Sequence, residues 1–126
     1  MSRGSILLVD DDLHSLRILS MMLESRGYRV RAVSDGTQAL EMMKLDRFGM
    51  LITDFEMPRM SGVELAIEVR AQHPDMQVVM VTGSNLQDII VPAVQAGVSA
   101  IIRKPLDFAE LMDVLGPSLP APATPG

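Results

Sequence analysis

Four short runs of consecutive apolar residues recur along this chain, and they constrain its fold more than any other feature. They lie at 6–9, 50–52, 78–81 and 100–102. Runs of this length are typical of strands that are buried on both faces, as in a parallel sheet covered by helices. Residues 28–33 alternate apolar and polar side chains instead. This alternation predicts a half-exposed strand at the edge of the sheet.

Segments with helical spacing separate these strands. The first has an apolar stripe that ends near Gly27, a glycine suited to the residue after a helix, and is formed by Leu13, Leu16, Leu19 and Leu23. Ser61, Ser84 and Asp107 have the residue type and spacing of helix N-caps. Regular alternation of strand and helix predicts a doubly wound α/β fold. We expect a flavodoxin-like (βα)5 architecture with five parallel strands in the order 2-1-3-4-5.

The length of 126 residues suits one domain with one core. We expect that domain to span residues 1–115. Residues 116–126 are rich in proline, which predicts a disordered tail or the start of a linker. A linker would imply a fused output domain beyond this tail.

Composition excludes several classes of protein. The chain has no cysteine, which removes disulfides, thiol nucleophiles and cysteine-based zinc sites. A net charge of −5 and few aromatic residues argue against direct binding of nucleic acid. No apolar run approaches the ~20 residues that span a bilayer, and the N-terminus lacks a signal-peptide pattern. We therefore expect a cytoplasmic protein without a membrane anchor.

Acidic residues follow two of the predicted strands. Asp10 and Asp11 come directly after 6–9, and Asp54 follows 50–52. In the expected strand order these ends are neighbours, so the three carboxylates converge. Two carboxylates ~4 Å apart repel by about 4 kcal/mol at an effective dielectric of 20, so the cluster is destabilising unless a cation or shifted protonation relieves the repulsion. Its hard oxygen ligands suit Mg²⁺.

The other strand ends carry hydrogen-bond donors. Lys104 is one of only two lysines and directly follows the last strand segment. Its ammonium can hold a carboxylate or phosphate oxygen. Thr82, followed by Gly83, adds a hydroxyl on the same edge. Together these groups suit phosphoryl transfer, with Asp54 as the nucleophile that forms an aspartyl phosphate. Asp12 is expected only to cap the first helix.

These residues stand in five motifs: Ile6–Asp12, Leu51–Gly62, Val79–Gly83, Ala96–Gly97 and Lys104–Pro105. The motifs closely resemble the receiver domain of two-component response regulators over about residues 5–115. The resemblance implies a signalling switch rather than an enzyme, although one that assists its own phosphorylation and dephosphorylation.

In this family the phosphoryl group comes from a phosphohistidine of a sensor histidine kinase or a histidine phosphotransfer protein. The resemblance implies that Asp54 accepts it. It also implies that Asp11, Asp54 and the backbone carbonyl of Glu56 contact Mg²⁺ directly, and that Asp10 acts largely through water. Thr82 and Lys104 would bind phosphoryl oxygens, with Thr82 moving toward them on activation.

The resemblance further implies a cis peptide bond before Pro105 and an output surface formed by the fourth helix, the strand at 100–102 and the fifth helix. That surface would control an output domain or a partner, or form a homodimer. Many receivers place Tyr or Phe where this chain has Ile101, so the familiar aromatic switch is missing. Pro92 falls inside the fourth predicted helix and predicts that this helix is irregular. Glu56 and Ser84 flank the phosphoryl site, where side chains commonly tune attack by water.

Three alternatives remain at the sequence level. A flavin-binding protein of the same fold would want a phosphate loop where this chain has three aspartates, which would repel the flavin phosphate. An aspartate-nucleophile phosphatase would share the spacing of Asp10 and Asp12 but not His14, and it would need a cap domain. A degenerate receiver that only docks partners, independently of phosphorylation, is opposed by the full set of site residues.

Overall fold

Five parallel strands form a single sheet in the order β2-β1-β3-β4-β5 in this computed structural model, which describes residues 4–118. The strands are β1 (Ser5–Val9), β2 (Arg29–Val33), β3 (Met50–Asp54), β4 (Gln77–Thr82) and β5 (Ala100–Arg103). Strand order and direction agree with the fold predicted from the sequence. Since parallel neighbours end on the same side, all five carboxyl ends lie along one edge.

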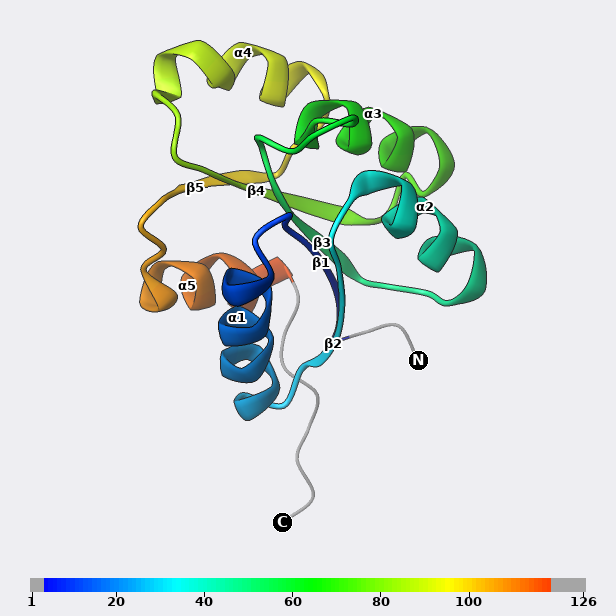
Figure 1. Cartoon of the computed structure of the whole chain (residues 1–126), viewed down its shortest axis with the longest axis vertical. Coiled ribbons are helices and arrows are strands. Elements are labelled where there is room, and N and C mark those ends of the chain that lie inside the picture. The colour runs from blue at the N-terminus through cyan, green and yellow to red at the C-terminus, as the bar shows by residue number, and fades with distance from the viewer. Residues whose placement is uncertain (1–3, 119–126) are drawn as a thin grey trace.

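Helices cover both faces of the sheet (Figure 1). They are α1 (Leu13–Ser25), α2 (Gly36–Leu45), α3 (Gly62–Gln72), α4 (Leu86–Gln95) and α5 (Phe108–Ser118). In Figure 1, α1 and α5 lie on one side of the sheet, and α2, α3 and α4 lie on the other. This is the doubly wound arrangement expected for right-handed crossovers.

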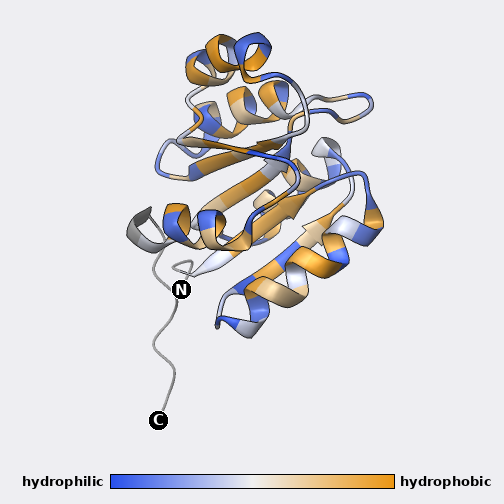
Figure 2. Ribbon diagram, turned by 90° about the vertical axis from the view of Figure 1, so that its left-hand side faces the viewer, coloured by the Kyte–Doolittle hydropathy of each residue, from blue (hydrophilic) through white to orange (hydrophobic). Residues whose placement is uncertain are grey.

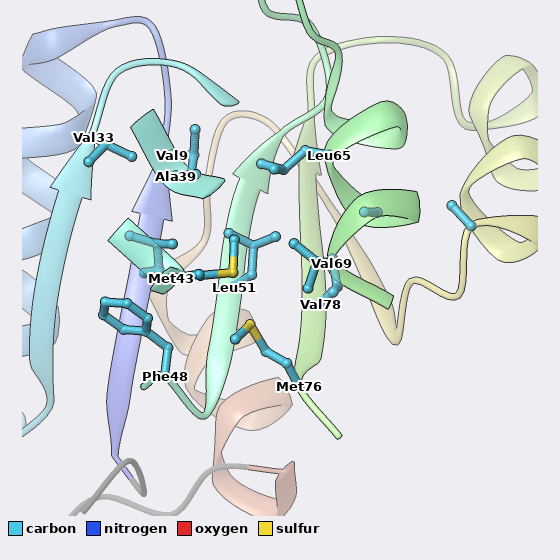
Figure 3. Packing of buried hydrophobic residues seen from close by; sticks show 13 residues of the cluster. Val9, Val33, Ala39, Met43, Phe48, Leu51, Leu65, Val69, Met76 and Val78 are labelled. Atoms are coloured by element: carbon cyan, nitrogen blue, oxygen red, sulfur yellow. The ribbon is translucent and has the colours of Figure 1, made fainter. Parts of the chain in front are cut away.

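Each face of the sheet has its own apolar cluster. Ile6 and Leu8 of β1 pack with α1 and α5, whereas Leu7 of the same strand packs with α2 and α3. Successive strand residues point to opposite faces, so a strand covered on both sides must be apolar throughout. Figure 2 shows this as strands coloured largely hydrophobic between helices that carry both hydrophilic and hydrophobic residues. In Figure 3, Leu51 and Val78 of the sheet face Met43 of α2 and Val69 of α3.

The edge strand β2 departs from this pattern as predicted. Arg29 and Arg31 are exposed, while Val33 at its carboxyl end is buried. Only one neighbour, β1, pairs with β2 among the described residues. Tyr28 and Val30 pack in the apolar cluster beside α1 and α5, whereas Val33, on the face of Arg29 and Arg31, packs in the cluster beside α2 and α3. The strand is therefore partly protected on both faces, and only the face of Arg29 and Arg31 is open to solvent along most of its length.

Several helix ends confirm the predicted caps. The Asp12 carboxylate accepts from two backbone N–H groups of the first turn of α1. Ser61 and Glu64 form a reciprocal capping box at α3. Asp107 accepts from the backbone N–H of Ala109 at the start of α5. Gly27, just past α1, has a φ of 93°, which glycine adopts without steric cost.

The start of α4 differs from the prediction. Asn85, not Ser84, is the N-cap, and its side chain accepts from the backbone N–H of Gln87. The prediction of an irregular helix is also wrong, because α4 continues without a break through Pro92. Proline removes only the bond to the carbonyl of Asp88, which is an exposed residue.

At the C-terminal end, α5 runs to Ser118, past the domain boundary expected after residue 115. Residues 119–126, which make up most of the predicted tail, lie outside the described part of the chain. Among residues 4–118, no helix has the length and apolar character needed to cross a membrane.

Candidate functional site

Three aspartates meet at the carboxyl ends of β1 and β3. Asp10 lies one residue beyond Val9, and Asp54 one beyond Thr53; Val9 and Thr53 are partners in the two neighbouring strands. One carboxylate oxygen from each of Asp10, Asp11 and Asp54 lies within 4.8 Å of the others. The structure thus brings together the acidic residues that the strand order predicted would converge.

Asp54 is the most buried member of this cluster, with only 5% of its surface exposed. Its Oδ2 atom lies 3.2 Å from Lys104 Nζ, while its Oδ1 atom is buried and has no hydrogen-bond partner among the described residues. Burial raises the pKa of Asp54 to about 6; the Asp10 carboxylate adds to this rise, and Lys104 opposes it. Asp54 therefore offers one paired oxygen and one open acceptor.

Lys104 supplies the positive charge of the site. Its Nζ atom lies 3.8 Å from Asp10 Oδ2 as well as close to Asp54, and its backbone N–H donates to the carbonyl of Thr82 at 2.7 Å. The bond between Lys104 and Pro105 is cis, as the resemblance implied. Burial alone would lower the pKa of Lys104, but the neighbouring Asp54, Asp10 and Glu56 carboxylates outweigh it and raise that pKa. The side chain is thus a charged ammonium at neutral pH.

The other acidic residues after β1 have distinct environments. Asp10 is half-buried and its Oδ1 accepts from the backbone N–H of Asp12 at 2.9 Å, which orients its carboxylate toward Lys104. Burial raises the pKa of Asp10, and that backbone hydrogen bond opposes the rise. Asp11 is exposed. Asp12 turns its carboxylate to the start of α1 and takes no part in the cluster.

This donor set fits a small divalent cation. Three carboxylates supply hard oxygen ligands, and one of their oxygens, Asp54 Oδ1, is buried without a hydrogen-bond partner among the described residues. Asp11 is exposed, which leaves room for bound water. Mg²⁺ prefers this combination of one or two carboxylates with several waters. The residues present can therefore hold the metal that the sequence analysis predicted.

Thr82 lies on the same edge of the sheet, at the end of β4, but its hydroxyl does not face Asp54 as a free donor. Thr82 Oγ1 donates to Glu56 Oε2 at 3.3 Å and accepts from the backbone N–H of Ser84 at 2.9 Å. Ser84 Oγ donates to the same Glu56 oxygen. The sequence predicts Glu56 and Ser84 beside the site but not these contacts, since no local pattern links residues 26 or 28 positions apart.

A cavity of about 290 Å³ adjoins the acidic cluster. Asp54 and Lys104 contribute to one part of its wall, and Ile18 and Met22 of α1 together with Leu106 contribute apolar side chains. No local pattern of the sequence predicts this cavity, because its walls come from separate elements. It makes the reactive edge accessible to an incoming group beside α1.

Comparison with known proteins identifies the family. Residues 6–116 match the family described as the response regulator receiver domain. The chain belongs to this family. The receiver domain is a phospho-accepting signalling module of two-component systems, and this one has an acidic pocket formed by Asp10, Asp11 and Asp54 with Lys104 beside it. Membership thus favours the receiver over the flavin-binding and phosphatase alternatives.

Relatives of this receiver domain differ in length. The chemotaxis protein CheY of Pseudomonas aeruginosa is 40% identical over 103 residues, which cover 79% of this chain and 83% of CheY. The transcriptional regulatory protein ZraR of Klebsiella oxytoca is 35% identical over 114 residues, which cover 90% of this chain but 26% of ZraR. The chain therefore spans about a quarter of the length of such transcriptional regulators.

Solved structures agree with the receiver fold. A signal receiver domain from Pseudomonas fluorescens superposes with a TM-score of 0.87 at 27% identity, covering 92% of this chain and 94% of that one. The response regulator TrrA of Thermotoga maritima, solved in complex with Mg²⁺-BeF, gives a TM-score of 0.83 at 27% identity, covering 91% and 98%.

Proposed function

We propose that this receiver accepts a phosphoryl group on Asp54 from the phosphohistidine of a sensor histidine kinase or a histidine phosphotransfer protein. The observation that carries the proposal is the setting of Asp54, a buried carboxylate with the Lys104 ammonium 3.2 Å away and two more carboxylates within reach. Such a setting combines a nucleophile with charges that can position and neutralise a phosphoryl group.

The transfer follows from the atoms of the site. A carboxylate oxygen of Asp54 attacks phosphorus, an O–P bond forms, and the P–N bond to the donor imidazole breaks with its electron pair left on nitrogen. Lys104, already paired with Asp54, then donates to a phosphoryl oxygen. Thr82 supplies a second donor once its hydroxyl leaves Glu56.

The metal in this proposal is Mg²⁺. Asp11, Asp54 and the backbone carbonyl of Glu56 would hold it directly, and Asp10 through water. When bound, it would supply positive charge that offsets the repulsion of the carboxylates and of the phosphoryl oxygens. The related TrrA, which has the same fold, was solved in complex with Mg²⁺-BeF, and this supports Mg²⁺ as the metal.

The response would pass through the surface formed by α4, β5 and α5. On α4, the side chains of Ile90, Val91 and Val94 are apolar and exposed. We propose that this surface contacts an output domain or partner, or a second copy in a homodimer. Relatives such as ZraR, which are longer and are named transcriptional regulators, support a fused output domain. Because Ile101 stands in place of an aromatic residue, the conformational change on phosphorylation would reach this surface through other side chains.

Incubation with Mg²⁺ and a small acyl phosphate, followed by intact mass measurement, tests the proposal. We expect wild type to gain the mass of one phosphoryl group and Asp54→Asn to gain none. Asp113→Asn, which changes an exposed aspartate of α5, is the matched control and should behave as wild type. No gain in wild type contradicts the proposal and would leave a docking module without phosphorylation. An equal gain in Asp54→Asn also contradicts it, because the phosphoryl group would then be attached to another residue.

A further inference from the structure

A closed ring of hydrogen bonds joins the loop after β3 to the loop after β4. Glu56 Oε2 accepts from both Thr82 Oγ1 and Ser84 Oγ, and the backbone N–H of Ser84 donates to Thr82 Oγ1 at 2.9 Å. Thr82 is fully buried, whereas Glu56 is exposed. We call this ring of Glu56, Thr82 and Ser84 the Glu56 latch.

The latch excludes the contact that phosphorylation requires of Thr82. A hydroxyl group has a single proton to donate. While Thr82 Oγ1 donates that proton to Glu56 Oε2, it cannot donate it to a phosphoryl oxygen on Asp54. Since Thr82 is fully buried, an unmade hydrogen bond would be costly, so its hydroxyl should always have one partner or the other. The two arrangements are therefore mutually exclusive.

Charge favours a change of partner when Asp54 is modified. The Glu56 carboxylate is close enough to Asp54 to contribute to the raised pKa of that group. A phosphoryl group on Asp54 brings further negative charge to the same edge, and like charges repel more strongly where water is partly excluded. Glu56 is exposed, so its side chain can turn into water.

Building on the proposed function, we propose that Glu56 is a positioning residue that holds Thr82 and Ser84 in the unphosphorylated receiver and releases them when Asp54 is phosphorylated. Holding the hydroxyl lowers the fraction of molecules in the active arrangement before phosphorylation. A ligand that binds only the active arrangement then binds more weakly, because its apparent affinity is multiplied by the fraction of molecules in that arrangement.

The first test measures the free protein and needs no phosphorylation. Three-bond NMR couplings report the side-chain rotamer of Thr82, and the amide signal of Ser84 reports its hydrogen bond to Thr82 Oγ1. We expect one Thr82 rotamer in wild type and rotamer averaging with a shifted Ser84 signal in Glu56→Ala. Glu56→Gln keeps an oxygen acceptor but loses the charge, so its Thr82 couplings and Ser84 signal should lie between those of wild type and Glu56→Ala.

Glu41→Gln is the control for the loss of one charge, because Glu41 is exposed on α2, where its carboxylate pairs with Lys44. It should leave both signals as in wild type. Thermal unfolding checks that every variant is folded, which the exposed position of Glu56 favours. Unchanged Thr82 couplings and an unchanged Ser84 signal in Glu56→Ala would overturn the latch.

The second test titrates each protein with Mg²⁺ and beryllofluoride, a phosphoryl mimic, and follows the amide signals. Removal of the latch should raise the apparent affinity of Glu56→Ala by about 3- to 10-fold, the size expected for loss of one net hydrogen bond. Ser84→Ala, which keeps Glu56 and Thr82, should show a smaller gain. An affinity of Glu56→Ala equal to that of wild type overturns the release step. A wild type that never responds contradicts the proposed function itself, and the release step with it, whatever the free protein shows.

Discussion

Lys104 and Asp54 form an ion pair of 3.2 Å between residues at the ends of β5 and β3. The two strands are not neighbours, since β4 lies between them. The long lysine side chain therefore reaches across the end of β4 to the buried carboxylate, and it lies 3.8 Å from Asp10 as well. The Lys104 ammonium thus lies near two carboxylates, and from this position it can also contact a phosphoryl group on Asp54.

Substitution of Lys104 should slow phosphorylation of Asp54. Lys104→Met keeps most of the side-chain volume but removes the donor and the charge, which raises the pKa of Asp54 further and leaves the phosphoryl group without its ammonium partner. We expect the rate of mass gain with an acyl phosphate to fall by about two orders of magnitude, a size typical for loss of one preorganised donor. Lys44→Met, at the only other lysine, should keep the wild-type rate. Equal rates for both variants would contradict this assignment of Lys104.

Addition of Mg²⁺ should stabilise the folded protein. A ligand that binds only the native state raises the unfolding temperature, and here it also relieves repulsion among Asp10, Asp11 and Asp54. We expect an upward shift in Tm with millimolar Mg²⁺ that EDTA reverses and that Asp11→Asn largely loses. Asp113→Asn should keep the shift. If Asp11→Asn shows the same shift as wild type, the metal does not bind at this cluster.

The raised pKa of Asp54 predicts how stability changes with pH in the absence of metal. Asp54 titrates at about 6 in the folded protein but near 3.8 when exposed, so between these values the folded state binds more protons than the unfolded state. The free energy of unfolding contributed by this group therefore falls as pH rises from about 4 to 6. At ~1.36 kcal/mol per pH unit, the loss is roughly 1 to 3 kcal/mol.

Urea unfolding of wild type and Asp54→Asn in EDTA measures this contribution, because subtraction cancels the other titrating groups. We expect the stability of wild type relative to Asp54→Asn to fall as pH rises from about 4 to about 6 and to change little above that. A wild type that instead gained stability relative to Asp54→Asn over this range would show that the buried carboxylate is stabilised in its charged form.

The fold could be predicted from the sequence because the patterns that indicate its strands and helices are local. Continuous apolar runs report strands buried on both faces, and strand ends in a parallel sheet gather along one edge. For that reason the meeting of Asp10, Asp11 and Asp54 was predictable once the strand order was assumed.

Contacts between loops were not predictable in this way. Ser84 has the spacing of a capping box, yet its hydroxyl donates to Glu56 and Asn85 caps α4 instead. The Ser84 hydroxyl could either cap α4 or donate to Glu56, and it donates to Glu56 because the tertiary structure brings that side chain close to it. Pro92 likewise lowers helix propensity locally, but the surrounding packing of Ile89 and Ala93, both buried, holds α4 together.

Arg59 has a φ of 70°, a left-handed conformation that side chains other than glycine and asparagine rarely adopt. Its ion pair with Asp35, at 4.0 Å and with Arg59 largely exposed, stabilises the loop little. Arg59→Asn should therefore raise the free energy of unfolding by about 0.5 kcal/mol, and the β-branched Arg59→Val should lower it by about 1 kcal/mol or more. Chemical denaturation measures both. A lower stability for the Asn variant than for the Val variant would refute the strain argument.

Gly62 at the start of α3 holds that helix against the reactive strand end. A Cβ atom at Gly62 would lie 2.3 Å from the backbone oxygen of Asp54 and 3.0 Å from Cα of Phe55. Backbone atoms cannot turn aside as a flexible side chain does, so Gly62→Ala must move either α3 or the peptide of Asp54. We expect a loss of about 2 kcal/mol in the free energy of unfolding, within the range for overpacked sites.

The same displacement should slow phosphorylation of Asp54, because the carboxylate and Lys104 must keep their spacing. Gly83→Ala is the matched control, since a Cβ there meets nothing within 4 Å. It should lose little stability, as measured by urea unfolding, and keep its rate of mass gain with an acyl phosphate. Equal losses in the two variants would mean that close approach to Asp54 is not what requires glycine at position 62.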